Sequence, residues 1–260
     1  MKSQSFVITI LVCLFVCNIG IGQDISTGKA QKQKERASKM NIFKVNIISP
    51  FLKNYSFQYE RILKKKISVA LGIRFMPTGA LPLKKTFLEL ADGDADLEKT
   101  INNARIGNFA LTPELRWYVG KKGYGKGFYI APYYRFATFK AEALPFEYDG
   151  GTGVKTASLA GDVTTHSGGI MFGSQWFLGK SITLDWWILG THYGKSNGTF
   201  TGTPSSPFTP AEQADIKQEI EAIDLPAGKI TAVITANSAK AIIDGPWAGL
   251  RGGITLGIRF

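Results

Sequence analysis

The chain has 260 residues and carries 31 Lys and Arg against 20 Asp and Glu, a formal net charge of +11. Its 44% hydrophobic and 12% aromatic content excludes a disordered chain, and two cysteines are too few for a disulfide scaffold. A basic balance first suggests nucleic acid, but the N-terminus points to export.

The first residues have the pattern of a secretory signal peptide. Lys2 precedes an apolar run over 6–17, and small or polar residues follow over 18–23. A basic start, a short apolar core and a small-residue exit define such signals. We therefore expect residues 1–23 to be removed, which leaves residues 24–40 as a basic N-terminal arm in the periplasm. Both cysteines lie within the signal, so no disulfide or cysteine-ligated metal is expected.

From residue 41 onward, apolar and polar residues alternate in eight segments, as in strands with one apolar face. The opposite face is rich in Gly, Ala, Ser and Thr with isolated charges, which suits a narrow lumen better than the water-facing side of a soluble sandwich. The apolar positions are Phe43, Val45, Ile47; Phe57, Tyr59; Ile67, Val69, Leu71, Ile73, Phe75; Phe109, Leu111, Pro113, Leu115, Trp117; Phe128, Ile130, Pro132, Tyr134, Phe136; Ile170, Phe172, Trp176; Ile182, Leu184, Trp186, Ile188; and Ile254, Leu256, Ile258, Phe260.

These segments predict an all-β fold: an eight-stranded antiparallel up-and-down transmembrane β-barrel over residues 41–260, with long extracellular loops containing short helices. Short links near 64–66, 120–127 and 179–181 alternate with long ones at about 77–106, 140–162 and 196–248. Periplasmic turns and extracellular loops of outer-membrane barrels alternate in this way. Four aromatic residues near the short links would form a girdle at the membrane boundary: Trp117, Phe128, Trp176 and Phe260.

The long links contain local signals of their own. Thr209-Pro210-Ala211-Glu212 is a capping box with Pro at the first helical position, so 210–223 is predicted to be a helix. A second helix is expected over 94–103 with Leu97 and Ile101 facing inward. Residues 230–234 fit either an extra strand or a segment beside the first helix.

Charged residues on the small-residue face are expected to neutralise one another inside the barrel. An eight-stranded barrel is just wide enough for side chains to fill it, so the lumen should be closed. The predicted lumen charge network consists of Lys44, Glu60, Arg74, Glu114, Arg116, Arg135, Asp185 and Arg259.

Much of the positive charge falls in the predicted periplasmic turns, where it would form a basic rim. Such a rim can attract anionic lipid headgroups or cell-wall polymer. The expected partner of the whole barrel is therefore the outer membrane with its lipid and lipopolysaccharide, and not nucleic acid. The rim consists of Lys64, Lys65, Lys66, Lys121, Lys122, Lys126 and Lys180.

Enzymatic signals are weak. The stretch 120–127 resembles a phosphate-binding P-loop but has Gly127 where Ser or Thr is needed, and an aromatic strand follows it. His192 and Ser196 stand four positions apart, about 13 Å along a strand and too far for proton transfer. His166 could approach His192 or Ser196 from the neighbouring strand. With two histidines and no close carboxylate, no metal and no cofactor are expected.

Several motifs resemble known families. Ile254-x-Leu256-x-Ile258-x-Phe260 is similar to the C-terminal signal by which the outer-membrane assembly machinery recognises its substrates. The stretches 46–50, 117–120, 129–136 and 184–190 resemble a family of small Bacteroidota outer-membrane proteins classed as a domain of unknown function, with a barrel architecture of the OmpA and OmpX type. The resemblance covers most of residues 40–260 outside the long loops, and implies a fold and a location but no activity.

The sequence thus predicts a non-enzymatic outer-membrane barrel that is structural or acts as a scaffold or subunit of an outer-membrane complex. Its loops are the expected contact surface for other outer-membrane proteins. A narrow porin is the first alternative, although Tyr129, Tyr133 and Trp187 would fill the lumen. A lipid A-modifying hydrolase is the second.

Overall fold

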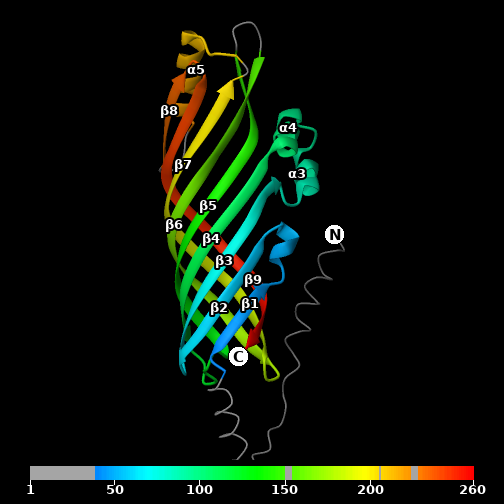
Figure 1. The fold of residues 1–260 in the computed structure, drawn as a ribbon, viewed down its shortest axis with the longest axis vertical. Helices are drawn as coiled ribbons and strands as arrows, with labels where there is room; N and C mark the ends of the chain where they lie inside the picture. Colours follow the sequence, from blue (N-terminus) through cyan, green and yellow to red (C-terminus); the bar gives the residue numbers. More distant parts are fainter. Residues whose placement is uncertain (1–38, 150–153, 205, 224–227) are drawn as a thin grey trace, which may run out of the picture. The chain divides into compact units, whose positions relative to one another are not determined.

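The computed structural model describes residues 39–149, 154–204, 206–223 and 228–260 (Figure 1). The chain divides into two units, residues 1–38 and Lys39–Phe260, and all that follows concerns the second unit. The expected signal peptide and the arm before Lys39 lie outside the described residues.

Eight strands form a closed antiparallel ring in which each strand pairs with the next along the chain and the last pairs with the first. This confirms the predicted all-β, up-and-down architecture with eight strands in the ring. The ring strands are β1(Asn41–Asn46), β2(Tyr55–Lys64), β3(Ile67–Ala80), β4(Arg105–Tyr118), β5(Gly127–Asp149), β6(Val154–Leu178), β7(Ile182–Pro204) and β9(Ser238–Arg259).

The ring closes where the two ends of the barrel sequence meet. The backbone N–H of Asn41 donates to the carbonyl of Phe260 at 3.0 Å, and the N–H of Phe260 donates back at 2.9 Å. At the other end of β1, the N–H of Ile47 donates to the carbonyl of Ile254. Backbone pairing between β1 and β9 therefore removes the unpaired edges that an open sheet would expose.

The turns after β2, β4 and β6, together with Lys39 and Phe260, lie at one end of the ring, here called the short-turn end (Figure 1). The opposite end, the long-strand end, carries the 3-10 helix η1(Ser49–Leu52), the helices α3(Lys84–Ala91), α4(Ala95–Asn103) and α5(Pro210–Glu221), and the ninth strand β8(Lys229–Thr235), which pairs only with β9.

Four strands are much longer than predicted. β5, β6, β7 and β9 have 23, 25, 23 and 22 residues, or about 75 Å for 23 residues at roughly 3.3 Å each. The predicted loops at 140–162 and 196–248 are therefore wrong for much of their length, since β5, β6, β7, β8 and β9 occupy them. Apolar alternation marks only the part of a strand with an apolar outer face, so it cannot detect a polar extension.

The helices agree with the predictions in part. α5 begins at Pro210 with the predicted capping box and ends at Glu221, two residues earlier than expected. α4 lies within the expected 94–103, but only Ile101 is buried, and Leu97 is exposed. α3 was not predicted, and residues 230–234 belong to strand β8.

A β-bulge in β7 reverses which residues point inward. The register against both β6 and β9 shifts between Trp187 and Gly190. Before the bulge the buried residues of β7 have odd numbers, as Asp185 does, and after it they have even numbers, as Ser196 does. Uninterrupted alternation would place Leu189 on the inner face with Trp187, but after the bulge Leu189 points outward and is exposed.

The outer surface of the ring is apolar where the strand prediction placed apolar residues. Large hydrophobic side chains lie exposed on every strand of the ring, including Phe43, Leu71, Leu115, Phe172 and Leu256. An apolar surface of this extent marks contact with lipid or with another apolar surface. Within the described ranges, none of the helices has the length and hydropathy that crossing a membrane requires.

Candidate functional site in the lumen

The lower half of the lumen holds a buried network of charged side chains with Lys44 and Arg116 at its centre. Lys44 on β1 donates to Glu60 at 2.5 Å, to Gln175 at 2.5 Å and to Asp185 at 2.7 Å. These acceptors come from β2, β6 and β7. An ammonium group has three donors, and all three are used across the interior.

Arg116 on β4 also donates hydrogen bonds to Glu60 and Asp185, and in addition to Glu114. Its Nη1 donates to Asp185 at 2.7 Å and to Glu60 at 3.3 Å, while its Nε and Nη2 hold Glu114 at 3.1 and 3.0 Å. The guanidinium carbon lies 4.4 Å from the centre of the Tyr129 ring. The side chains of Arg116 and of its three carboxylate partners are at most 1% exposed.

Neutral side chains complete the hydrogen bonding of these carboxylates. Glu60 accepts from Ser68 at 2.5 Å and from Tyr118 at 2.7 Å. Asp185 accepts from Tyr129 at 2.8 Å and from the Trp187 indole at 3.2 Å. Because burying a charge is costly unless it is paired and hydrogen-bonded, this saturation makes a charged lumen compatible with a stable fold.

Glu114 links this network to a second group of cations above it. Arg251 on β9 donates to Glu114 at 2.9 Å, and its guanidinium lies 5.0 Å from the Tyr133 ring and 4.8 Å from the Trp187 ring. Arg135 donates to Thr112 at 3.1 Å. Arg74 has a buried Nε with no hydrogen-bond partner.

The structure therefore divides the eight predicted lumen charges into three places. It brings Lys44, Glu60, Glu114, Arg116 and Asp185 into one bonded network. Arg74 and Arg135 lie higher, beside a cavity.

Arg259 is separate from both groups. It lies near the short-turn end, where it donates to the Lys39 carbonyl at 2.9 Å and covers the Phe177 ring at 4.4 Å.

Sequence reasoning missed the residues that bridge these groups. Arg251 lies in β9, seven residues after Asp244, where the pairing with β8 ends, and the sequence pattern predicts a strand only from Gly253 onward. The alternation places Gly253 on the inner face, and residues two positions apart in a strand share a face. Extending the predicted strand to Arg251 would therefore have placed that residue in the lumen. Inward Gln58 and Gln175 were overlooked because uncharged amides carry no electrostatic signal in the sequence.

The structure does not bring the three hydrolase candidates together. His166 is exposed on the outside of β6, where its Nδ1 lies 2.5 Å from the Tyr134 hydroxyl. His192 points inward, with its Nδ1 3.2 Å from the Tyr133 hydroxyl, and Ser196 donates to the Gly245 carbonyl at 3.2 Å. The sequence-based approach of His166 to His192 or Ser196 is wrong, because these side chains lie on opposite faces of the sheet.

No group of three or more His, Cys, Asp or Glu side chains that could hold a metal ion occurs in the described part of the chain. The three buried carboxylates of the lumen face Lys and Arg donors at hydrogen-bond distance instead. Their lone pairs are occupied by these donors.

The predicted basic rim and aromatic girdle lie near the short-turn end. Six of the seven lysines are exposed, and Lys126 is half-buried with its Nζ 6.0 Å from the Phe177 ring. The four girdle aromatics are exposed. Arg61 on the same side donates to Asn41 at 2.7 Å, as does Tyr59 at 2.6 Å.

The C-terminal strand presents the predicted assembly signal on the outer surface. Leu256, Ile258 and Phe260 are exposed, and Ile254 is half-buried. The intervening Thr255, Gly257 and Arg259 point into the lumen.

Comparison with known proteins gives a family but no activity. No curated protein matches the sequence. The translocator domain of the autotransporter NalP from Neisseria meningitidis is a similar solved structure, with 7% sequence identity, a TM-score of 0.32, and coverage of 90% of this chain and 96% of that one. A family model described as "Protein of unknown function (DUF3575)" matches residues 13–197, well over half of the chain. The chain therefore belongs to this family of proteins of unknown function.

Proposed function

We propose that this protein is an outer-membrane β-barrel with a closed lumen, and that it acts as a scaffold or as a subunit of an outer-membrane complex. The observation that carries this proposal is the buried network of Lys44 and Arg116. Its members come from β1, β2, β4, β6 and β7, so their hydrogen bonds cross the interior from one side of the ring to the other.

The outer surface supports a membrane location. Exposed apolar side chains surround the ring, and aromatic residues near the short-turn end suit a membrane interface. The N-terminal sequence fits a cleaved export signal. We propose that the short-turn end lies in the periplasm and the long-strand end outside the cell, in a Gram-negative bacterium of the Bacteroidota type.

Planar-bilayer recording of the purified full chain tests the closed lumen. We expect no stable conductance steps from the wild type, because ionic side chains block the interior. A variant that removes two central blockers, Arg116→Ala with Tyr129→Ala, serves as the positive control and should conduct if it folds and inserts. Stable steps from the wild type would favour the narrow-porin alternative and overturn the closed-barrel proposal.

The long-strand end is the proposed interaction surface. It carries α3, α4, α5 and β8 on strands that continue past the shorter β1 and β2. Pulldown of tagged protein from gently solubilised membranes should recover a partner in a fixed ratio. Deleting residues 205–237 and joining the ends of β7 and β9 should abolish recovery without preventing barrel formation.

The basic rim is proposed to contact anionic lipid headgroups of the periplasmic leaflet or cell-wall polymer, because six of its lysines are exposed at one end. Partitioning of the protein onto vesicles with anionic lipid should weaken as salt rises. Replacing Lys64, Lys65 and Lys66 by Gln should reduce that salt dependence. If the partitioning of the wild-type protein does not change with salt concentration, the proposal is contradicted.

A non-enzymatic role is proposed for the histidines. The separation of His166 from Ser196 across the sheet supports it. Mass spectrometry of lipid A from cells with wild-type protein and with Ser196→Ala should show the same acylation pattern. A difference confined to acyl chain number would revive the hydrolase alternative.

A further inference from the structure

A cavity of about 130 Å³ lies in the lumen directly above the charge network. It is bounded by the upper end of β1, by η1 and by the inner faces of β3, β4, β5 and β9. A volume of this kind holds several water molecules or one small polyatomic ion. Its polar lining includes Arg74, Arg135, Arg251, Thr112, Asn54 and Ser56.

The charges around this cavity do not balance. Arg251 is paired with Glu114, and the same carboxylate also accepts a hydrogen bond from Arg116. In the bonded network, three cations already match three anions. The cations are Lys44, Arg116 and Arg251, and the anions are Glu60, Glu114 and Asp185. No carboxylate of the described residues lies within ion-pair distance of Arg74 or Arg135, which leaves two excess cations.

The donors of these two arginines are also under-used. A guanidinium has five N–H donors. Arg135 uses one of them on Thr112, and Arg74 has a buried Nε with no hydrogen-bond partner. Asn54, which also lines the cavity, has a buried amide oxygen without a hydrogen-bond partner. Buried polar groups are normally satisfied, so this set points to a missing anionic acceptor.

The lumen is blocked below the cavity and narrowed above it. The network of Lys44 and Arg116 lies below. Above, the rings of Phe139 and Trp247 meet with centroids 5.0 Å apart, although β5 and β9 are separated in the sheet by β6 and β7. A contact between such strands crosses the concave interior.

The wall beside the cavity has a break in its strand pairing. β1 pairs with β9 only from Thr255 to Arg259, and β8 pairs with β9 only up to Asp244. Residues 245–253 of β9 therefore have no partner strand on that side within the described ranges. Apolar side chains flank this break, since Ile48, Leu52 and Leu250 line the cavity and are all exposed. A ligand with an anionic head and an apolar tail would match such an entrance.

We propose that this cavity binds a phosphate-type oxyanion, either free in solution or as the monoester headgroup of a lipid, through the guanidinium groups of Arg74 and Arg135. Arg and phosphate form parallel, charge-assisted hydrogen bonds. The site goes beyond the proposed scaffold role and does not depend on whether the lumen conducts.

Isothermal titration of the purified full chain in nonionic detergent at low salt, with inorganic phosphate as the probe, tests the site. We expect saturable binding to one site, at least about tenfold weaker binding for Arg74→Gln or Arg135→Gln, and none for the double variant. Arg105→Gln removes an exposed arginine and should bind as the wild type does. Absence of saturable binding by the wild type, or equal binding by the double variant, would overturn the proposal.

A loss of folding must be separated from a loss of binding. Each variant is therefore first checked for the shift in gel mobility on heating that folded barrels show, and only folded protein is titrated. If Arg135→Gln fails to fold, Arg74→Gln alone is used for the test, because the buried Nε of Arg74 has no hydrogen bond whose loss would destabilise the barrel.

A second arm distinguishes the two sources of phosphate. Native mass spectrometry after incubation with phosphatidic acid, or with a zwitterionic lipid of the same chains, measures retained lipid. Selective, Arg74-dependent retention of phosphatidic acid assigns the site to a lipid headgroup. Binding of free phosphate alone assigns it to a solute, and both results support the oxyanion site. Bilayer conductance is measured in a separate experiment. A negative result for phosphate binding therefore overturns the oxyanion site only and does not bear on the closed-barrel proposal.

Discussion

At the scale of single residues, the lumen depends on charges that are each satisfied by several partners. Asp185 alone accepts hydrogen bonds from Lys44, Arg116, Tyr129 and Trp187. Such a network is stable when complete, and removal of one member leaves an uncompensated charge in a low-dielectric interior. Individual substitutions should therefore have effects far above those of surface changes.

Replacing Lys44 by Met tests this coupling. The substitution keeps much of the side-chain volume but leaves Arg116 as the only cation bonded to both Glu60 and Asp185 among the described residues. The buried charges are then unbalanced, which should lower the free energy of unfolding by about 3–5 kcal/mol. Urea unfolding of the refolded protein in detergent, followed by tryptophan fluorescence, measures it. Lys65→Met at the exposed short-turn end should change the value by less than about 0.5 kcal/mol.

Glycine is required at position 173 because a Tyr side chain crosses directly above it. A Cβ at Gly173 would collide with the Tyr129 hydroxyl, the group that donates to Asp185. We expect Gly173→Ala to lower the free energy of unfolding by about 1–3 kcal/mol through overpacking. Gly120→Ala, where a Cβ meets nothing within 4 Å, should be close to neutral in the same denaturant titration.

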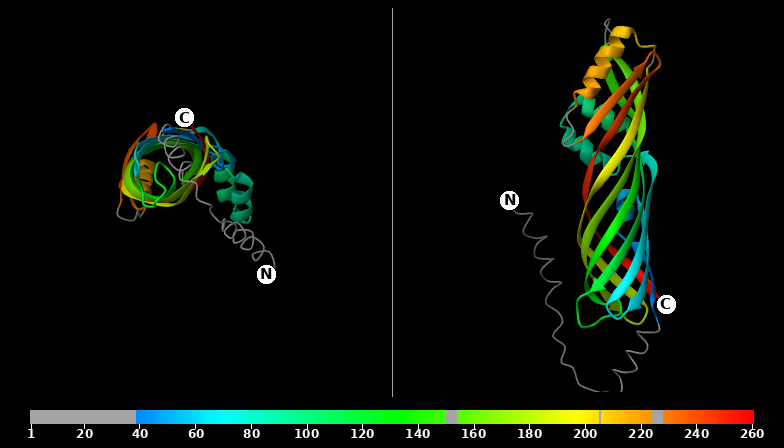
Figure 2. Two further views of the ribbon diagram at one scale, coloured as in Figure 1. Left: turned by 90° about the horizontal axis from the view of Figure 1, so that it is seen from below. Right: turned by 90° about the vertical axis from the view of Figure 1, so that its left-hand side faces the viewer.

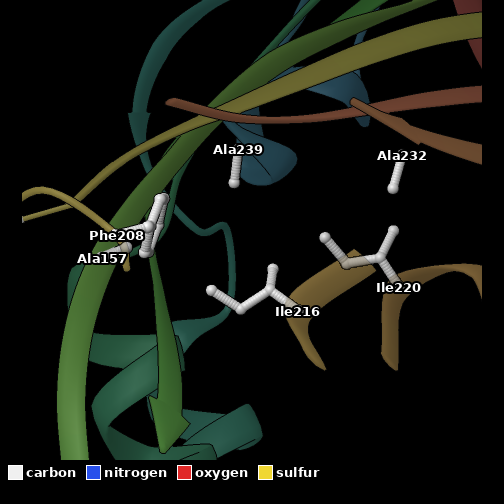
Figure 3. Close-up of a cluster of buried hydrophobic side chains, with 6 residues drawn as sticks. All are labelled: Ala157, Phe208, Ile216, Ile220, Ala232 and Ala239. Carbon is white, nitrogen blue, oxygen red and sulfur yellow. The ribbon is translucent and has the colours of Figure 1, made fainter. Parts of the chain in front are cut away.

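At the scale of elements, α5 is a small helix held on the inner face of the strand extensions. Its inward Ile216 and Ile220 pack with Phe208 and with Ala157, Ala232 and Ala239 of β6, β8 and β9 (Figure 3). The Glu221 carboxylate also accepts from the Ala232 N–H at 3.0 Å, which ties the end of the helix to β8. These contacts form a core separate from the charged lumen, so α5 can open without unfolding the ring.

Ile216→Ala should loosen this core while sparing the barrel. Removing a buried Ile side chain costs about 2–4 kcal/mol, and here the loss falls on the docking of α5. We expect hydrogen exchange of the α5 amides to accelerate strongly while amides of β3 and β4 keep their protection. Ile223→Ala removes a side chain that is 55% exposed and should leave the α5 exchange rates nearly unchanged.

The start of α5 should respond to pH. A hydrogen bond from Lys155 and the backbone N–H of Thr209 lower the pKa of the Glu212 carboxyl below its ordinary value of 4.5. Because a carboxyl with a depressed pKa stabilises the fold in its charged form, the contribution is complete above pH 4.5 and disappears as the pH falls through the lowered pKa.

Glu212→Gln isolates that charge, because Gln retains the capping-box hydrogen bond but cannot pair ionically with Lys155. After correction for intrinsic rates, protection of the first-turn amides should fall in the wild type between pH 6 and pH 3. In the variant it should be lower at pH 6 and change little. Glu219→Gln on the exposed face of the same helix should behave as the wild type, and an identical pH response in Glu212→Gln would refute the role of the ion pair.

At the scale of the whole molecule, one strand pair converts a sheet into a barrel. β1 contributes only six residues, and its backbone bonds with β9 close the ring (Figure 2). The last residue of the chain is part of that closure, since Phe260 exchanges two backbone hydrogen bonds with Asn41. Its exposed ring also belongs to the predicted assembly signal.

Two variants separate these roles of Phe260. Deletion of the residue removes the backbone bonds and the ring, whereas Phe260→Ala removes only the ring. If the ring is the recognition element, both variants should lower the folded fraction in cells several-fold, as measured by heat-modifiable gel mobility. If closure is the limiting feature, the deletion alone should do so, and normal folding of both would contradict both roles.

The sequence by itself determined the number of ring strands, their antiparallel order and the outward facing of the apolar residues in the eight alternating segments, because a period of two along a strand needs no distant contact to be read. It also placed Lys44, Glu60, Glu114, Arg116 and Asp185 on one face. Only the tertiary structure decided that these five bond together, whereas Arg74 and Arg135 remain beside a cavity and Arg259 lies near the short-turn end.

The remaining errors share a physical cause. A bulge after Trp187 adds one residue to β7, so all side chains of β7 beyond the bulge point to the opposite face from the one that simple alternation predicts. His192 therefore points inward. Nothing in the local sequence indicates the position of the bulge. The strand extensions escaped detection because the outer side chains beyond the apolar band no longer alternate. Periodicity is local, whereas register, bulges and the level of each charge along the lumen depend on pairing between strands far apart in the sequence.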